Sequence, residues 1–168
     1  TAEIIGAEPG TWLLTSTSKK HIAAGMQALV TVRDCGLPRP TVDAASKMRS
    51  YFIAAEEADW LGTKRQMFVE YRDRTFKEKH TRDKSTSYLG AVGPLIHAEV
   101  GDVLKIVFYN KLNTSLVIIP SGLRTSKEYE GLVYNDGRSP NRRVVTAPGE
   151  KRTYYWFVPS HLGPGNKD

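Results

Sequence analysis

Short stretches rich in β-branched and aromatic residues recur along the chain, separated by clusters of Gly, Pro, Asn and Asp. Such stretches are typical of β-strands, and the residues between them are typical of turns. They lie at 12–14, 26–32, 51–55, 67–71, 94–98, 103–109, 116–119 and 153–158. No segment keeps a helical periodicity for long. The sequence therefore predicts an all-β antiparallel sandwich or barrel.

A break interrupts this strand pattern at residues 36–48. It begins with the sequence GLPRP, and two prolines within three residues exclude a central strand. Residues 41–48 could form one or two helical turns. We therefore predict a linker between two units of β-structure.

The charge of the chain does not indicate a nucleic-acid ligand. Its 24 Lys and Arg residues exceed its 18 Asp and Glu residues, a formal charge of +6, which by itself favours an anionic partner. However, basic residues alternate with acids in the segment 77–84 (KEKHTRDK), which predicts a solvated loop. No apolar run approaches the length of a membrane span, and the start shows no signal-peptide pattern. If the protein is secreted, we expect its signal to lie outside this chain.

Two single residues bear on the cellular compartment. Cys35 is the only cysteine; it is either a small buried apolar residue or half of a disulfide whose partner lies outside this segment. Asn113 begins the triplet Asn-Thr-Ser, an acceptor for N-glycosylation in a secreted protein.

Ser16, His21 and Met26 have the spacing of a copper loop, but not its chemistry. A blue-copper site takes a thiolate, an imidazole and a weak axial thioether from one loop between two strands. A serine hydroxyl is hard and stays protonated at neutral pH, so Ser16 cannot replace the thiolate. We predict no type 1 copper here. The remaining histidines, His80, His97 and His161, lack metal-type spacing and are expected to be satisfied or solvent-facing.

The segment 127–137 (KEYEGLVYNDG) mixes acids with turn residues. Carboxylates and carbonyls in a bent loop can bind calcium, but calcium needs six to eight oxygens. Arginines rather than acids follow the segment, which favours an ordinary surface turn.

Several ordered motifs resemble the family of ceruloplasmin, hephaestin and coagulation factors V and VIII. The first two, PGTWLL and HIAAGMQA, are similar to the closing segment of an even-numbered cupredoxin domain. The others follow the family's order through the next domain. They are YFIAAEEADW (51–60), YRDRTF (71–76), LGAVGPLIHAEVGD (89–102), APGE (147–150), YYW (154–156) and GP (163–164).

The resemblance implies a cupredoxin (plastocyanin-like) Greek-key β-sandwich. Residues 1–35 would be the C-terminal strands of one domain, 36–48 a linker, and 49–168 most of a second domain without its last strands. It also implies a disulfide from Cys35 to an upstream cysteine. The segment after Trp60 is shorter than in relatives.

The resemblance also implies that the copper ligands are lost. The family's Cys falls on Ser16, and its His-x-His falls on Ile119 and Ser121, so His21 and Met26 are expected to be remnants of a lost type 1 site. In the coagulation-factor branch a lysine carbonyl, a Glu and an Asp bind calcium. Those positions are Lys127, Glu130 and Asp136, but the rest of that ligand set is absent.

By this resemblance, the segment is a non-catalytic, copper-free module of a secreted multidomain protein. We expect a cofactor or scaffold like coagulation factors V and VIII, which would bind a protease or substrate protein. The alternative is a structural domain of a ceruloplasmin-like or hephaestin-like ferroxidase with its copper elsewhere. A third reading is an adhesion or storage protein. The expected partners are other cupredoxin domains of the same protein, with membrane contact only through other domains, and calcium in the parent protein.

Overall fold

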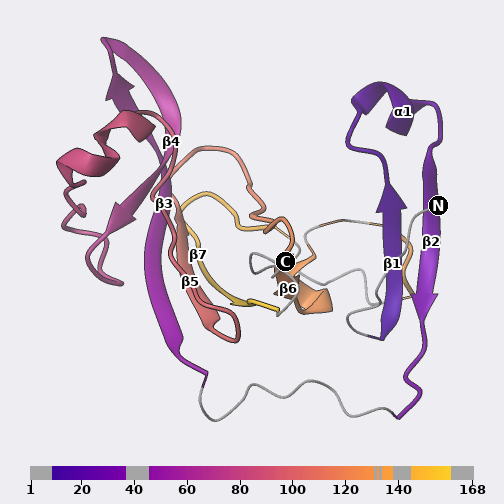
Figure 1. The fold of residues 1–168 in the computed structure, drawn as a ribbon. Helices are drawn as coiled ribbons and strands as arrows, with labels where there is room; N and C mark the ends of the chain where they lie inside the picture. The colour runs from indigo at the N-terminus through magenta and orange to yellow at the C-terminus, as the bar shows by residue number, and fades with distance from the viewer. Residues whose placement is uncertain (1–8, 37–45, 131, 133, 138–144, 160–168) are drawn as a thin grey trace, which may run out of the picture.

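The computed structural model describes residues 9–36, 46–130, 132, 134–137 and 145–159, and these residues are predominantly β-structure (Figure 1). The all-β prediction is confirmed, and the two sheets present are consistent with a cupredoxin-like sandwich. The elements are β1 (Gly10–Thr15), α1 (Lys19–Ala23), β2 (Gln27–Val32), β3 (Met48–Trp60), β4 (Thr63–Tyr71), the 3-10 helix η1 (Lys84–Leu89), β5 (Val103–Asn110), β6 (Arg124–Thr125), the 3-10 helix η2 (Lys127–Tyr129) and β7 (Lys151–Phe157).

The N-terminal unit is an antiparallel hairpin. β1 pairs with β2 from Gly10 opposite Val32 to Thr15 opposite Gln27, and the short helix α1 lies in the connection. Figure 1 shows this hairpin (indigo to violet) standing apart from the larger sheet. β2 begins at Gln27, one residue after the start of the predicted strand 26–32, because Met26 belongs to the loop.

The second unit is a five-stranded sheet in the order β4-β3-β5-β7-β6. β3 and β5 pair in parallel, and the remaining pairs are antiparallel. A parallel pair cannot be joined by a tight turn. The chain therefore passes from β3 to β5 through β4 and then through a crossover connection, residues 72–102. β3 begins at Met48, so the last residue of the predicted linker belongs to the strand.

β3 and β4 are joined by a two-residue turn, Leu61-Gly62, which directly follows Trp60. Both Leu61 (φ 50°) and Gly62 (φ 76°) have positive φ. This is the geometry of a type I′ hairpin turn, which matches the twist of the flanking strands. Glycine adopts it freely, whereas Leu61 does so at a steric cost.

Both faces of the sheet are covered where β3 and β5 meet. Ile53 and Ala55 contribute to the larger apolar cluster, while Ala54 between them packs on the other side with Tyr71 and Phe76. The larger cluster consists of Ile53, Ala55, Leu104, Ile106, Phe108, Leu112, Tyr154, Trp156 and Val158.

Two of the predicted strands are wrong. Residues 94–98 have no strand partner: Pro94 lacks a backbone N–H, and the Tyr51 hydroxyl instead binds the backbone N–H (3.0 Å) and carbonyl (2.9 Å) of His97. The stretch 116–119 forms only an isolated bridge from Leu116 to Thr146. The helical turns considered for 41–48 fall mostly outside the described residues.

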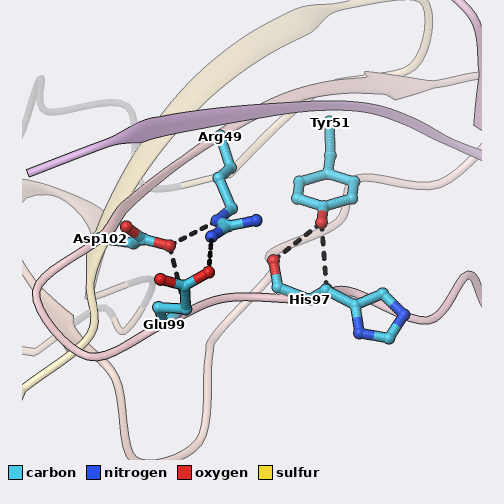
Figure 2. A network of polar contacts seen from close by, with 5 residues as sticks. All are labelled: Arg49, Tyr51, His97, Glu99 and Asp102. Carbon is cyan, nitrogen blue, oxygen red and sulfur yellow. Dashed lines mark hydrogen bonds and ion pairs between the residues drawn. The ribbon is translucent and has the colours of Figure 1, made fainter.

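An ion-pair network fixes the crossover beside the start of β3 (Figure 2). The Arg49 guanidinium contacts Asp102 and Glu99, the latter at 2.7 Å. The Glu99 backbone N–H donates to Asp102 Oδ2 at 2.8 Å, and this bond together with Arg49 lowers the pKa of Asp102. Figure 2 shows the Tyr51 hydroxyl hydrogen-bonded to the backbone of His97, while the imidazole ring points away from Tyr51.

Candidate metal sites and buried charge clusters

The loop between β1 and β2 brings Ser16, His21 and Met26 together. Ser16 Oγ lies 3.2 Å from His21 Nδ1, so one ring nitrogen already has a hydroxyl partner. The Met26 backbone N–H donates to the His21 carbonyl at 3.0 Å, and Ser16 N–H donates to the Met26 carbonyl at 3.4 Å. The sequence spacing thus translates into proximity. Their role as remnants of a copper site stays a prediction.

These residues do not fit a type 1 copper ion. Such a site needs a thiolate, and the group in that place is a hydroxyl. Met26 is 58% exposed. Ile119 is also exposed, and neither Ile119 nor the exposed Ser121 offers a soft ligand. Within the described part of the chain, no group of three or more His, Cys, Asp or Glu residues is placed to hold a metal.

The other predicted residues are scattered. His80 and His97 are exposed and lie in separate segments, and His161 is outside the described residues. Cys35 is exposed as well, so the buried-residue interpretation is wrong. Its disulfide with an upstream cysteine stays a prediction. Asn113 is exposed, and its glycosylation also stays a prediction.

The three candidate calcium residues of the segment from η2 onward have largely buried side chains, whereas Glu128, Asn135 and Gly137 are exposed, so the predicted surface turn is only partly right. The Lys127 side chain is only 4% exposed, Glu130 is 9% exposed and Asp136 is 12% exposed. The Lys127 ammonium contacts Glu130 Oε2 and the Tyr134 hydroxyl, and lies 3.7 Å from Asp136 Oδ2. The ammonium therefore occupies the space between the two carboxylates where calcium was considered.

Three consecutive residues of β1 complete this cluster. The Lys127 ammonium lies 4.6 Å from the Trp12 ring. The Tyr134 hydroxyl lies 3.0 Å from the Thr11 carbonyl oxygen, and the Leu13 N–H lies 3.5 Å from Glu130 Oε1. Burial, followed by the hydrogen bond to Glu130, raises the pKa of Tyr134 far above its usual value. The phenol therefore stays protonated.

A second buried charge cluster, which the sequence analysis did not predict, lies around Glu56 of β3. Glu56 follows the apolar residues of β3 and is buried. It accepts a hydrogen bond from the Tyr71 hydroxyl (2.6 Å) and ion pairs from Lys79 (2.5 Å) and Lys111 (3.2 Å). The Lys111 ammonium lies 4.1 Å from the Tyr71 ring centroid. The only sequence signal was that Glu56 directly follows the predicted apolar strand 51–55. A carboxylate in that position needs a charged or hydrogen-bonding partner if it is buried.

This cluster lines a pocket of about 600 Å³. Burial alone would raise the pKa of Glu56, but hydrogen bonds from Lys79, Tyr71 and Lys111 outweigh it and lower the pKa. Burial and the bond to Glu56 raise the pKa of Tyr71. The group is thus fixed as carboxylate, phenol and ammonium. The lining residues are Glu56, Glu57, Tyr71, Lys79, Lys111, Leu112 and Asn113.

Comparison with known proteins gives matches over the whole chain. Hephaestin of Homo sapiens is 36% identical over 203 residues, covering 100% of this chain and 17% of that protein. Ceruloplasmin of Rattus norvegicus is 35% identical over 201 residues, covering 98% of this chain and 19% of that protein. The chain belongs to the ceruloplasmin and hephaestin family of multicopper-oxidase-like proteins. No protein-family model matches it.

This chain spans under a fifth of the length of those two relatives. Another similar protein, from Mus musculus, is named a ferroxidase and is 30% identical over 203 residues, covering 100% of this chain and 17% of that protein. These relatives favour the ferroxidase alternative over the expected coagulation cofactor, which gains no support from them.

In the described part of the chain, no helix is long and apolar enough to cross a membrane.

Proposed function

We propose that this chain is a copper-free structural segment of a larger ferroxidase-like protein whose copper sites lie in other domains. The observation that carries the proposal is the Ser16–His21 contact, in which a hydroxyl lies where a copper loop needs a thiolate. The segment would close one cupredoxin domain and build most of the next. Its partners would be the other cupredoxin domains of the same protein.

The named ferroxidase among the relatives supports the class of the parent protein. Full-length activity would be oxidation of iron(II), and the parent would be located outside the cell, either secreted or anchored. The described residues would supply rigid sheets for this activity, not its ligands.

Copper analysis of the intact protein tests both parts. We expect the intact protein to contain copper, to show a blue absorption band and to oxidise iron(II). We expect His21→Ala to leave copper content and oxidation rate unchanged, because His21 is not a ligand. His97→Ala is a matched control, since it removes another exposed histidine.

Two results would overturn the proposal, each in a different part. Loss of copper in His21→Ala, but not in His97→Ala, would place a metal in the β1–β2 loop. An intact protein without copper or iron oxidation would remove the ferroxidase class and return attention to a scaffold that binds other proteins.

A further inference from the structure

We propose that the Lys127 ammonium, together with Glu130 and Tyr134, holds β1 in place, and that this junction between consecutive domains needs no divalent metal ion. The partner surface is the outer edge of β1. The argument rests on burial, on the placement of the ammonium, and on which backbone groups of β1 are contacted.

Burial makes the partners of Lys127 necessary. A buried ammonium costs several kcal/mol unless it is paired. Here it contacts Glu130 and the Tyr134 hydroxyl and faces the ring of Trp12 from β1. Contact with β1 adds the Trp12 ring to these partners, so Lys127 has this cation–π contact only when the two units are together.

The ammonium also excludes a metal ion from this place. Calcium takes its oxygen ligands at about 2.3–2.6 Å and needs six to eight of them. An ion bound by both Glu130 and Asp136 would have to share their space with the positive charge of Lys127. A calcium ion and the ammonium group, placed between the same two carboxylates in a buried site, would repel each other strongly. The Lys127 ammonium therefore takes the place that a metal cation would occupy.

The contacts to β1 take the place of a neighbouring strand. Among the described strands, β1 pairs only with β2, so its other edge has no strand partner. In an antiparallel strand, residues i and i+2 turn their N–H and C=O groups to the same edge. Thr11 and Leu13 have this relation, and the side chains of Tyr134 and Glu130 lie against their carbonyl and N–H. Side chains thereby cover an edge that would otherwise be open.

Hydrogen exchange across β1 in the intact protein, measured by mass spectrometry, tests this inference. We expect Lys127→Met to speed exchange in the peptide 10–15 about tenfold or more, because it removes the ammonium that pairs with the buried Glu130 carboxylate. Adding EDTA to the unsubstituted protein should change nothing there. Lys111→Met is the matched control: it also removes a lysine paired with a carboxylate, but one whose recorded contacts lie on the five-stranded sheet.

If the Lys127→Met protein does not fold, Tyr134→Phe provides a second test. It removes one hydroxyl, and we expect a smaller increase in the hydrogen-exchange rate of the same peptide, 10–15. Three results would each overturn the inference: faster β1 exchange with EDTA, unchanged β1 exchange in a folded Lys127→Met protein, or equal effects of the two lysine substitutions on β1. None of these readouts depends on copper content, so they are separable from failure of the proposed function.

Discussion

Replacing Glu56 by glutamine should destabilise β3 and β4 by about 2 kcal/mol at neutral pH. Glutamine keeps the size of the side chain and a carbonyl oxygen that can accept the Tyr71 hydroxyl. It removes the charge that faces two lysines. Lys79 is 57% exposed, so its pair contributes below about 1 kcal/mol. Lys111 is only 26% exposed, so leaving it unpaired should cost about 1–2 kcal/mol.

The same substitution should change the response to acid. The pKa of Glu56 is lower in the folded protein than in the unfolded chain, because its three donors outweigh burial. Its stabilisation is therefore complete above the unfolded pKa of about 4.3 and is lost as the pH falls through the lower folded pKa. Glu56→Gln lacks this loss, so the two proteins should converge in stability in acid.

Hydrogen exchange of β3 and β4 peptides in the intact protein measures the effect locally, since a multidomain protein has no single free energy of unfolding. A double-mutant cycle adds Lys111→Met or Lys79→Met to Glu56→Gln. We expect the larger coupling with Lys111. The reasoning is refuted if Glu56→Gln leaves exchange unchanged at neutral pH, or if Lys79 shows the larger coupling.

Two further substitutions test packing, again by hydrogen exchange of the intact protein. Gly90 has φ +54°, and Gly90→Ala would place a methyl group 2.6 Å from the Trp60 ring, so we expect a loss of about 2–4 kcal/mol in stability. Gly101 has φ +89° but open space around it, so Gly101→Ala should cost only about 1–2 kcal/mol. Equal effects would contradict this contact. Asn110→Asp should cost about 3 kcal/mol, because the buried amide donates to two backbone carbonyls that a carboxylate cannot serve. Asn113→Asp, on the exposed side chain nearby, should change stability little; a similar loss in both would argue against the role of the amide.

The strands that the sequence predicts best are those whose β-branched and aromatic residues are mostly buried or half-buried. Residues 103–109 form most of β5 and residues 153–157 form most of β7, because apolar and aromatic residues there pack in the core. The stretch 94–98 also contains apolar residues, yet it is not a strand, and Pro94 is its one local sign of this. The backbone of His97 is bound by the Tyr51 hydroxyl, and this contact between residues 46 positions apart could not be predicted from the local sequence.

The candidate sites divide in the same way. The proximity of Ser16, His21 and Met26 was predictable, because a single loop carries all three. The cluster around Glu56 was not, because Lys111 reaches it from 55 positions away. The parallel pairing of β3 with β5 brings those residues together, and this pairing is not visible in local spacing.

The two buried charge clusters share one arrangement, in which a lysine contacts a glutamate and a tyrosine hydroxyl and lies over the ring of that tyrosine. The sets are Lys111, Glu56 and Tyr71, and Lys127, Glu130 and Tyr134. In both sets burial and the glutamate raise the pKa of the tyrosine, so each phenol keeps its proton at neutral pH. A protonated phenol held by an ion pair is a poor general base, because a base must be free to take a proton near the working pH. Both arrangements therefore favour fixing loops to strands over acid–base chemistry, which agrees with a structural role for this segment.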